Sequence, residues 1–439
     1  MPEFRAANRE PPRRAVHRPG PGASGGLLAA CLACLPPSGA QASNGLNLIG
    51  YGAESVAMAG ADVAIAADTL ALNTNPAGIA RLGPRAFDLH TAVAHAVDVS
   101  HADDFGNDQS VSNRFIPVGG VGYVHRPEGS RCAWGIALFG QGGAGFVYED
   151  LNTLFGTVDE LSSLVRIARL SPGVACESAG GVHVGAALAV SYADIEQKIF
   201  PNTSLGPFFG TDLKGASGWG ATIKLGLLAP LSDTLTLGAT YTPKVSLPLR
   251  GGRLVSNQSA AGRGLVTYHD VDIDGMALPD EASLGLAWRV SPDWLVSAEL
   301  TWLNWSDAAT HSTLTATHPD NPAAPPISVT STLDWRDQIV LALGVAWRYD
   351  AETTVFGGIN VARNPIPSEH LSPILAPIGE KHLTLGMKRA LNREWALSLA
   401  MEYQFRNTVT YTNPDLPLGQ NATERNESVA AHAMFGKRW

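Results

Sequence analysis

The stretch Trp395-Ala396-Leu397-Ser398-Leu399-Ala400-Met401-Glu402-Tyr403-Gln404-Phe405-Arg406 alternates strictly between large apolar side chains and small or polar ones. Because successive side chains of a β-strand point to opposite faces, this period predicts a strand with one apolar and one polar face. The same alternation recurs at 282–289 and 339–348. A soluble β-sandwich would give this pattern too, since its apolar faces turn to a core, so the period alone leaves both architectures open.

The connections between the alternating segments separate these two architectures. Along the chain, short turns such as Leu231-Ser232 and Ser291-Pro292 alternate with long loops, which is the asymmetry of an outer-membrane barrel. We predict an all-β fold, a transmembrane antiparallel up-and-down β-barrel of about fourteen strands, an even number as bacterial barrels require. The expected strands lie near 85–97, 113–126, 132–142, 164–176, 181–196, 214–229, 233–247, 281–290, 293–305, 336–349, 352–363, 380–389, 393–408 and 427–439.

The composition agrees with a barrel that crosses a membrane. The chain of 439 residues is 45% hydrophobic and 16% charged, yet it has no apolar run long enough for a spanning helix. Its 46 glycines and evenly spread apolar residues suit strands that face lipid on one side only. The net charge of -9 excludes a nucleic-acid partner, which would require a basic stripe.

The first residues have the character of an export signal. Five arginines precede the apolar run 25–35, and Ala40-Gln41-Ala42 supplies the small residues of a cleavage site. We predict a signal peptide at 1–42 with cleavage after Ala42. A lipoprotein signal at Cys31 is the alternative, but too little of the apolar run precedes that cysteine.

Residues 43–84 differ from the rest of the chain. They are rich in Gly, Ala and Asn and lack a long alternating run, but they hold too many apolar residues for a disordered tail. We expect a compact plug, or hatch, inside the lumen of a barrel formed by 85–439. Trp439 ends the chain with an aromatic residue, which resembles the signal read by the outer-membrane assembly machinery, although Lys437 departs from that pattern.

Several short motifs resemble one known family. They are Gly45-Leu46-Asn47, Ala66-Ala67-Asp68, Asn75-Pro76-Ala77-Gly78, Leu278-Pro279-Asp280, Trp305-Ser306, Trp335-Arg336-Asp337, Gly357-Gly358 and Asn364-Pro365-Ile366-Pro367. Their order and spacing resemble the FadL/TodX family of outer-membrane transporters for long-chain fatty acids and aromatic hydrocarbons. The resemblance implies a fourteen-stranded barrel blocked by a hatch. A ligand would dock among extracellular loops, pass to a lumenal pocket, and leave sideways where a strand kinks inward near the Asn-Pro-Ala block.

The resemblance assigns the hatch and gating role to Asn75, Pro76, Ala77 and Gly78. Pro76 fixes φ and has no N–H, so the turn cannot join a helix or a ladder. Asn75 can hydrogen-bond nearby backbone and hold the turn in shape. An ordinary Asn-Pro turn without a gating role is the alternative interpretation.

Ligand contacts are predicted in two places. The loop from Gly143 to Ser163 carries apolar residues at spacings near three and four, which indicates an amphipathic helix. It resembles the family's docking groove, although packing of loop residues on one another explains the pattern equally well. The candidate contacts here are Phe146, Leu151, Leu154, Phe155 and Leu161.

Charged residues inferred from strand parity to face the lumen form the second group. They are Lys224, Arg289, Glu299, Arg348, Glu402 and Arg406. We expect a lumenal salt-bridge network among them. Arg289, Arg348 and Arg406 are also candidates for binding a carboxylate, because charge-assisted hydrogen bonds orient an acid headgroup.

Two further signals concern cysteines and metals. Cys132 opens one predicted strand and Cys176 closes its neighbour, so a disulfide could form at the periplasmic rim. The acidic group Asp98, His101, Asp103, Asp104 and Asp108 lacks the spacing of a calcium loop, so we predict no metal site. Gly140-Gln141-Gly142-Gly143-Ala144-Gly145 fits a dinucleotide-binding motif, but the antiparallel strands around it exclude that fold.

We therefore expect passive uptake of hydrophobic compounds, without enzyme activity or a cofactor. The partners would be a hydrophobic ligand, outer-membrane lipid and lipopolysaccharide, and the assembly machinery, with the protein acting as a monomer in the bacterial outer membrane. An outer-membrane lipase is one alternative, for which His269 and Asp270 are the nearest candidates without a suitable serine. A general porin is the other, and the plug argues against it.

Overall fold

The computed structural model of the protein describes residues 44–178, 180–416 and 421–439. The predicted signal peptide, with Cys31 and the cleavage position after Ala42, lies outside the described residues and stays a prediction.

Fourteen antiparallel strands form a closed barrel, as the sequence predicts. Each strand pairs with its neighbour along the chain, and the last pairs with the first from Ala86–Arg438 to Ala102–Thr423, which closes the wall. No edge strand remains in this wall, which is what a barrel that crosses a membrane requires. The strands are β1 (Arg85–Ala102), β3 (Phe115–His125), β4 (Cys132–Asn152), β5 (Val158–Glu177), β6 (His183–Leu205), β7 (Phe208–Pro230), β8 (Leu235–Thr242), β13 (Glu281–Ser291), β14 (Trp294–Leu303), β17 (Gln338–Arg348), β18 (Thr353–Ala362), β19 (Lys381–Ala390), β20 (Trp395–Tyr411) and β21 (Ala422–Arg438).

The two faces of the wall differ as the alternation predicts. On β20, Leu399 and Met401 are exposed, whereas Ser398 and Ala400 are buried. Exposed apolar area on this scale suits a wall that faces lipid. The outer face carries Leu89, Val93, Ile136, Leu138, Leu188, Ile223, Leu284, Leu286, Ile339 and Leu385.

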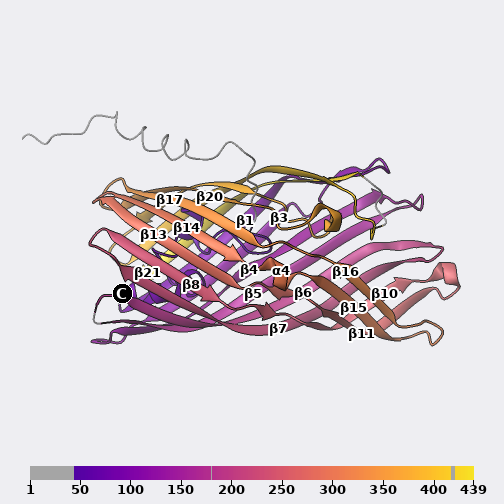
Figure 1. The fold of residues 1–439 in the computed structure, drawn as a ribbon, viewed down its shortest axis with the longest axis horizontal. Coiled ribbons are helices and arrows are strands. Elements are labelled where there is room, and N and C mark those ends of the chain that lie inside the picture. The colour runs from indigo at the N-terminus through magenta and orange to yellow at the C-terminus, as the bar shows by residue number, and fades with distance from the viewer. Residues whose placement is uncertain (1–43, 179, 417–420) are drawn as a thin grey trace, which may run out of the picture. The chain divides into compact units, whose positions relative to one another are not determined.

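The predicted short turns lie at one end of the barrel, and the longer connections lie at the other, together with the tips of the extended β4–β5 and β6–β7 hairpins. In Figure 1 the C-terminus marks the short-turn end, and the added strands of the long loops extend from the opposite end. Strand β10 continues the wall from β7, and β11, β15 and β16 pair onward from it. The added elements are β2 (Asp108–Ser110), β9 (Val245–Ser246), β10 (Leu249–Asn257), β11 (Leu265–Asp274), β12 (Ala277–Leu278), β15 (His311–Pro319), β16 (Ile327–Thr332), η2 (Ser259–Ala261), α4 (Trp305–Ala308) and η3 (Ser368–His370).

Strands β4 to β7 are longer than the sequence pattern indicates. β4 runs to Asn152 and β5 begins at Val158, so the predicted amphipathic helix within Gly143–Ser163 is wrong. Beyond the lipid no apolar outer face is required, so the period-two pattern fades while the ladder hydrogen bonds continue. Residues spaced by three and four along this hairpin imitate a helical stripe.

The residues before β1 form a compact hatch that contacts the inner face of the barrel. It contains α2 (Ala53–Ala57), α3 (Ala71–Thr74) and the 3-10 helix η1 (Pro76–Arg81). α2 contacts β18 to β21, and η1 contacts β4 to β7. Among the described residues, no helix is long and apolar enough to cross a membrane.

Candidate functional site

The turn that begins at Asn75 is fixed to both the hatch and the wall. The buried Asn75 side chain donates from Nδ2 to the carbonyl oxygens of Val63 (2.8 Å) and Leu227 (2.9 Å). Its Oδ1 accepts from the backbone N–H of Ala77 at 3.1 Å, which caps η1. Pro76 occupies the first position of η1, where its missing N–H leaves no donor unpaired. Asn75 therefore uses both amide protons and its oxygen to hold this turn against β7.

Pairs of glycines in the wall make room for the hatch. Gly185 on β6 and Gly226 on β7 are register partners. A Cβ on Gly185 would lie 2.5 Å from Ala77 N, and one on Gly226 would lie 2.1 Å from Asn75 Oδ1. Three more partner pairs face the hatch in the same way: Gly135 and Gly173 against Leu72, Gly238 and Gly285 against Val63 and Ala64, and Gly344 and Gly358 against Met58 and Ala59. Only glycine allows so close an approach of two backbones.

Strand β4 bends toward the hatch at Gly140–Gly143. The β4–β5 register shifts between Gly140 and Gly142, and Gly143 N–H donates to the carbonyl oxygen of Leu46 at 3.0 Å. A Cβ on Gly142 would lie 1.9 Å from that same oxygen. The glycine run that resembled a dinucleotide motif is therefore a β-bulge that brings two backbones together.

Gln141, at the centre of this bend, is hydrogen-bonded to three hatch residues. Its Nε2 donates to Asn47 Oδ1 (3.1 Å) and to Tyr51 Oη (2.7 Å). Its Oε1 accepts from Asn73 Nδ2 at 3.0 Å. Because Asn73 lies two residues before Asn75, the bend and the Asn-Pro-Ala turn belong to one connected region.

The ladder between β3 and β4 stops beside this bend. Register pairs run from His125–Trp134 to Gly120–Phe139 and no further among the described residues. The residues just before β3 contact β4 again, where Ser112 N–H donates to the carbonyl oxygen of Val147 (2.8 Å) and Asn113 Nδ2 donates to that of Gly145 (3.1 Å). Between these two points, β3 and β4 form a seam in the wall that is not closed by ladder pairs. We call residues 114–119 of β3 and its approach, with 140–145 of β4, the β3–β4 seam.

Three of the predicted lumenal charges have local partners. Lys224 Nζ lies 2.6 Å from Glu281 Oε1, and Glu402 Oε1 lies 2.8 Å from His382 Nδ1. Glu299 accepts from the backbone N–H of Val63 in the hatch at 2.9 Å. The charges thus form separate contacts on the wall and the hatch instead of one network.

The lumenal position predicted for Arg406 is wrong. The β20–β21 register shifts between Gln404 and Asn407, and this bulge reverses the parity from which the position was inferred. The Arg406 side chain is 55% exposed and pairs with Asp98 (3.0 Å) and Glu427 (2.9 Å). It shares Glu427 with Tyr403, whose side chain lies on the outer face. Arg406 therefore does not face a ligand in the lumen.

Arg289 and Arg348 lie at the short-turn ends of β13 and β17. Arg348 is exposed there. Arg289 lines a cavity between the wall and the hatch. The three candidate arginines do not converge on one headgroup site, because Arg406 lies in the other half of the barrel.

A buried apolar cluster fills the long-loop end above the hatch. Phe146, Leu151 and Leu161 of the β4–β5 hairpin belong to it. Phe155 stacks on Phe208 with ring centroids 4.6 Å apart, while Leu154 at the tip of the hairpin is exposed. The cluster also holds Leu46, Tyr148, Phe200, Leu303, Trp305, Trp335, Ile366, Leu371, Ile374, Ile378 and Tyr411.

Sequence reasoning missed the loop between β18 and β19 as part of this cluster. Ile366, Leu371, Ile374 and Ile378 are buried there, although the loop has no regular period. The available signal was apolar residues at short intervals in a proline-rich connection, which are unusual for a solvated loop. The sequence likewise showed the glycines at Gly140–Gly143 but not that they face Leu46.

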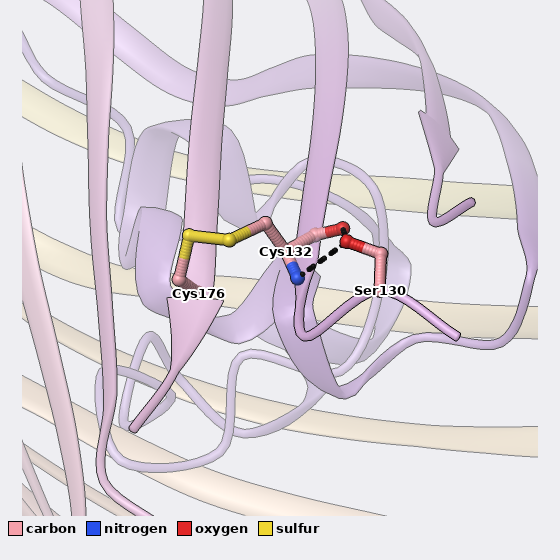
Figure 2. The surroundings of a disulfide bond; sticks show 3 residues. All are labelled: Ser130, Cys132 and Cys176. Atoms are coloured by element: carbon pink, nitrogen blue, oxygen red, sulfur yellow. Dashed lines mark hydrogen bonds between the residues drawn. A yellow bond between two sulfur atoms is a disulfide. The ribbon is translucent and has the colours of Figure 1, made fainter. Parts of the chain in front are cut away.

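Cys132 and Cys176 form a disulfide at the short-turn end. They are register partners on β4 and β5, with Cα atoms 4.0 Å apart. Figure 2 shows the bond beside Ser130, whose Oγ accepts from the Cys132 N–H at 3.0 Å. The bond ties together the strand that carries the inward bend and its neighbour.

The weaker signals do not form sites. Among the described residues, no group of histidine, cysteine and carboxylate side chains could hold a metal ion. Asp98, Asp103 and Asp108 contact Arg406, His101 and Arg425 instead. Asp270 pairs with His318 at 2.6 Å, which gives its carboxylate a partner outside the lipase arrangement considered for His269.

Comparisons with known proteins agree with this architecture. Residues 29–435 match the family described as outer membrane protein transport protein (OMPP1/FadL/TodX). No curated protein sequence matches the chain significantly.

Solved structures of similar fold cover most of the chain. The toluene transporter TodX of P. putida superposes with a TM-score of 0.72 at 20% identity, over 90% of this chain and 99% of that one. The toluene transporter TbuX of Ralstonia pickettii gives the same values. A Pseudomonas aeruginosa FadL homologue has a TM-score of 0.69 at 15% identity, over 90% and 98% of the two chains. Since the family match spans nearly the whole sequence, the chain belongs to the OMPP1/FadL/TodX family of bacterial outer-membrane transport proteins.

Proposed function

We propose that the protein takes up hydrophobic small molecules by passive diffusion, long-chain fatty acids or aromatic hydrocarbons among them, and releases them sideways into the membrane. The observation that carries this proposal is the combination of a hatch tied to the wall with a β3–β4 seam beside it. The hatch opposes passage straight through the barrel, and the seam provides a sideways exit through the wall. We further propose that it acts as a monomer, with outer-membrane lipid and lipopolysaccharide around its apolar face.

The apolar cluster at the extracellular end is the proposed docking region. Its side chains come from the β4–β5 hairpin and from the loop between β18 and β19, two segments that can separate without breaking the barrel. An apolar solute that enters among them leaves water, which is favourable by about 25 cal/mol for each Å² of apolar surface. The solved structures of similar fold include toluene transporters, and this chain offers an apolar entrance suited to such compounds.

The hatch is held too firmly to leave as a whole during each transport event. Beyond the contacts of Asn75 and Gln141, Asn360 Nδ2 donates to the carbonyl oxygen of Ala59 (3.0 Å), and Thr384 Oγ1 donates to that of Ala57 (3.0 Å). Lys388 Nζ lies 2.9 Å from a carboxylate oxygen of Glu54. Removing the hatch would break all these buried contacts together, whereas opening a seam breaks few.

The β3–β4 seam leads to lipid. Phe115, beside it on β3, is exposed on the outer face of the wall, and the next residue, Ile116, is exposed on the inner face. A Cβ on Gly140 would lie 3.2 Å from Val118 Cγ1, so the Val118 side chain packs beside Gly140 across the seam. A small shift of this side chain suffices to open the seam. An apolar solute gains more by moving through it into lipid than by entering the aqueous periplasm, so no energy source is required.

A cross-link across the seam tests the proposal. The pair Val118→Cys and Gly140→Cys should form a disulfide that holds the seam shut, because the two positions are in contact. We expect uptake of a radiolabelled fatty acid or of toluene to fall severalfold in the oxidised variant and to recover with a reductant. The matched control is Val121→Cys with Leu138→Cys, register partners in the same two strands where the ladder is already complete.

Two results would contradict the proposal. Uptake that is equally fast with the seam cross-linked would place the exit elsewhere. Large, steady, salt-proportional conductance of the intact protein in planar bilayers would indicate a general porin, which a tightly held hatch does not allow.

A further inference from the structure

A cavity of about 250 Å³ lies at the periplasmic end, between the hatch and the wall. The hatch contributes residues 64–67 with Arg81 and Leu82, and the wall contributes residues of the β7–β8 turn, β8, β13 and β14. One water needs only roughly 10–15 Å³ of such space, so the cavity admits a small organic molecule. An occupant would touch the hatch and the barrel at once.

This cavity is separate from the lumen. A smaller cavity of about 60 Å³ lies on the lumenal side of Val63 and shares no lining residue with the first. The backbone of Val63 and Ala64, seated on Gly238 and Gly285, runs between the two. The periplasmic cavity is therefore not a part of the proposed transport route.

Two arginines face this cavity, one from each component. Arg81 ends η1, and its Nη1 donates to the carbonyl oxygen of Ile65 at 3.3 Å. Arg289 comes from β13. Within the described part of the chain, no carboxylate lies at ion-pair distance from either guanidinium, although Asp233 lines the same cavity. Partial burial lowers the pKa of Arg81, and the positive charge of Arg289 lowers it further.

The surroundings add positive charge and apolar surface. Arg126 Nη1 donates to the carbonyl oxygen of Ala80, next to Arg81, at 3.2 Å. The rest of the lining is mainly apolar, with Ile65, Leu82 and Leu295 as its largest side chains. Two like charges held near each other without an anion are unfavourable, and a bound carboxylate would relieve their repulsion through charge-assisted hydrogen bonds.

We propose that this cavity binds a small amphipathic carboxylate from the periplasm. The carboxylate lies between Arg81 and Arg289, and the apolar body packs against Ile65, Leu82 and Leu295. Because one guanidinium belongs to the hatch and the other to the barrel, the bound anion joins the two and stabilises the seated hatch. This inference is independent of the proposed uptake route.

Calorimetric titration of the full chain in lipid nanodiscs tests the proposal with three probes. Benzoate carries the charge and an apolar ring, benzyl alcohol carries the ring alone, and inorganic phosphate carries charge alone. We expect saturable benzoate binding that weakens by about tenfold in Arg81→Gln and in Arg289→Gln, the size expected from losing one charge-assisted contact. Both side chains are exposed at one end, so the variants should fold, which the heat-dependent electrophoretic shift of a barrel will verify.

The matched control is Arg348→Gln, another arginine at the periplasmic rim that does not line the cavity. Its benzoate affinity should stay within twofold of the wild-type value. Benzyl alcohol should bind with an affinity that neither cavity substitution changes. Absence of saturable benzoate binding, or equal weakening by Arg348→Gln, would overturn the proposal. Phosphate binding as tight as benzoate binding would overturn the amphipathic specificity.

Discussion

Asn75 in the hatch donates a hydrogen bond to the carbonyl oxygen of Leu227 on β7, 2.9 Å away, next to a glycine that leaves room for its side chain. This contact joins the hatch to the wall at a point where neither water nor lipid could replace it. The strength of the closed state therefore depends on an amide whose two protons each meet a carbonyl oxygen.

Replacing Asn75 by aspartate tests this dependence with almost no change of shape. Asn75→Asp keeps the oxygen that caps Ala77 but turns an acceptor toward the carbonyls of Val63 and Leu227. Each buried carbonyl left without a donor costs about 1–3 kcal/mol, so the hatch should loosen. We expect faster cleavage of the hatch by added protease and higher bilayer conductance. Both effects should shrink as the pH falls, because a protonated carboxyl group regains one donor.

Asn75→Gln is a less suitable control, because a longer side chain would not fit against Gly226. Asn257→Asp is better, since Asn257 on β10 contacts neither the hatch nor the seam, while its Nδ2 donates to the carbonyl oxygen of Pro201 at 3.3 Å and its Oδ1 accepts from the Ser259 N–H at 3.4 Å. If Asn75→Asp is as protease-resistant as the control at neutral pH, the hatch does not depend on this amide.

Adding a single methyl group at Gly226 should displace the same turn. In Gly226→Ala the new Cβ would lie 2.1 Å from Asn75 Oδ1 and 2.8 Å from Pro76 Cδ, far inside van der Waals contact. Overpacking of this kind costs about 1–3 kcal/mol and should appear as increased leak conductance. Gly357→Ala is the matched control, because its Cβ would meet nothing closer than 3.5 Å. Equal conductance of the two variants would refute the tight seating of the hatch on β7.

The strands of this fold were more predictable than the features that depend on irregular backbone. Leu399 and Met401 face lipid because the period-two rule is local and holds wherever a ladder is regular. Arg406 was misplaced because one bulge after Gln404 reverses parity, and no side chain before it signals the shift. The spacing of apolar residues in the hairpin around Leu151 looked helical. Outside the lipid, that spacing is set by packing against residues of distant loops and not by the strand period.

The hatch contacts show the same division. Pro76 could be recognised as a turn residue from its chemistry alone, but its position on Gly185 and Gly226 depends on strands more than a hundred residues away. Gln141 has three hatch partners that no spacing rule connects to it. The glycines of the wall are far apart in the sequence, so their role in making room for the hatch could be recognised only from the strand register that pairs them.

Digestion with trypsin followed by mass spectrometry can verify the disulfide directly, whether or not the two sulfur atoms are accessible to a labelling reagent. Cleavage after arginine and lysine should release peptides 132–166 and 170–198 joined through Cys132 and Cys176, and reduction should separate them. Because the bond closes a segment with a sequence separation of 44, its loss in Cys132→Ser with Cys176→Ser should lower the unfolding free energy by about 2–4 kcal/mol. Two separate peptides with reactive thiols in the unreduced protein would exclude the bond.

Deleting residues 44–82 should turn a closed barrel into an open one. The wall does not need the hatch for its ladder, since β1 and β21 close it independently, so the variant should still fold and show the electrophoretic shift of a barrel. The lumen would then lose the side chains of α2, α3 and η1 that fill it, and the glycine pairs would line water. We expect steady conductance and swelling of liposomes in small sugars, in contrast to the intact protein. A deletion variant that folds but stays impermeable would mean that the extracellular apolar cluster, and not the hatch, closes the barrel.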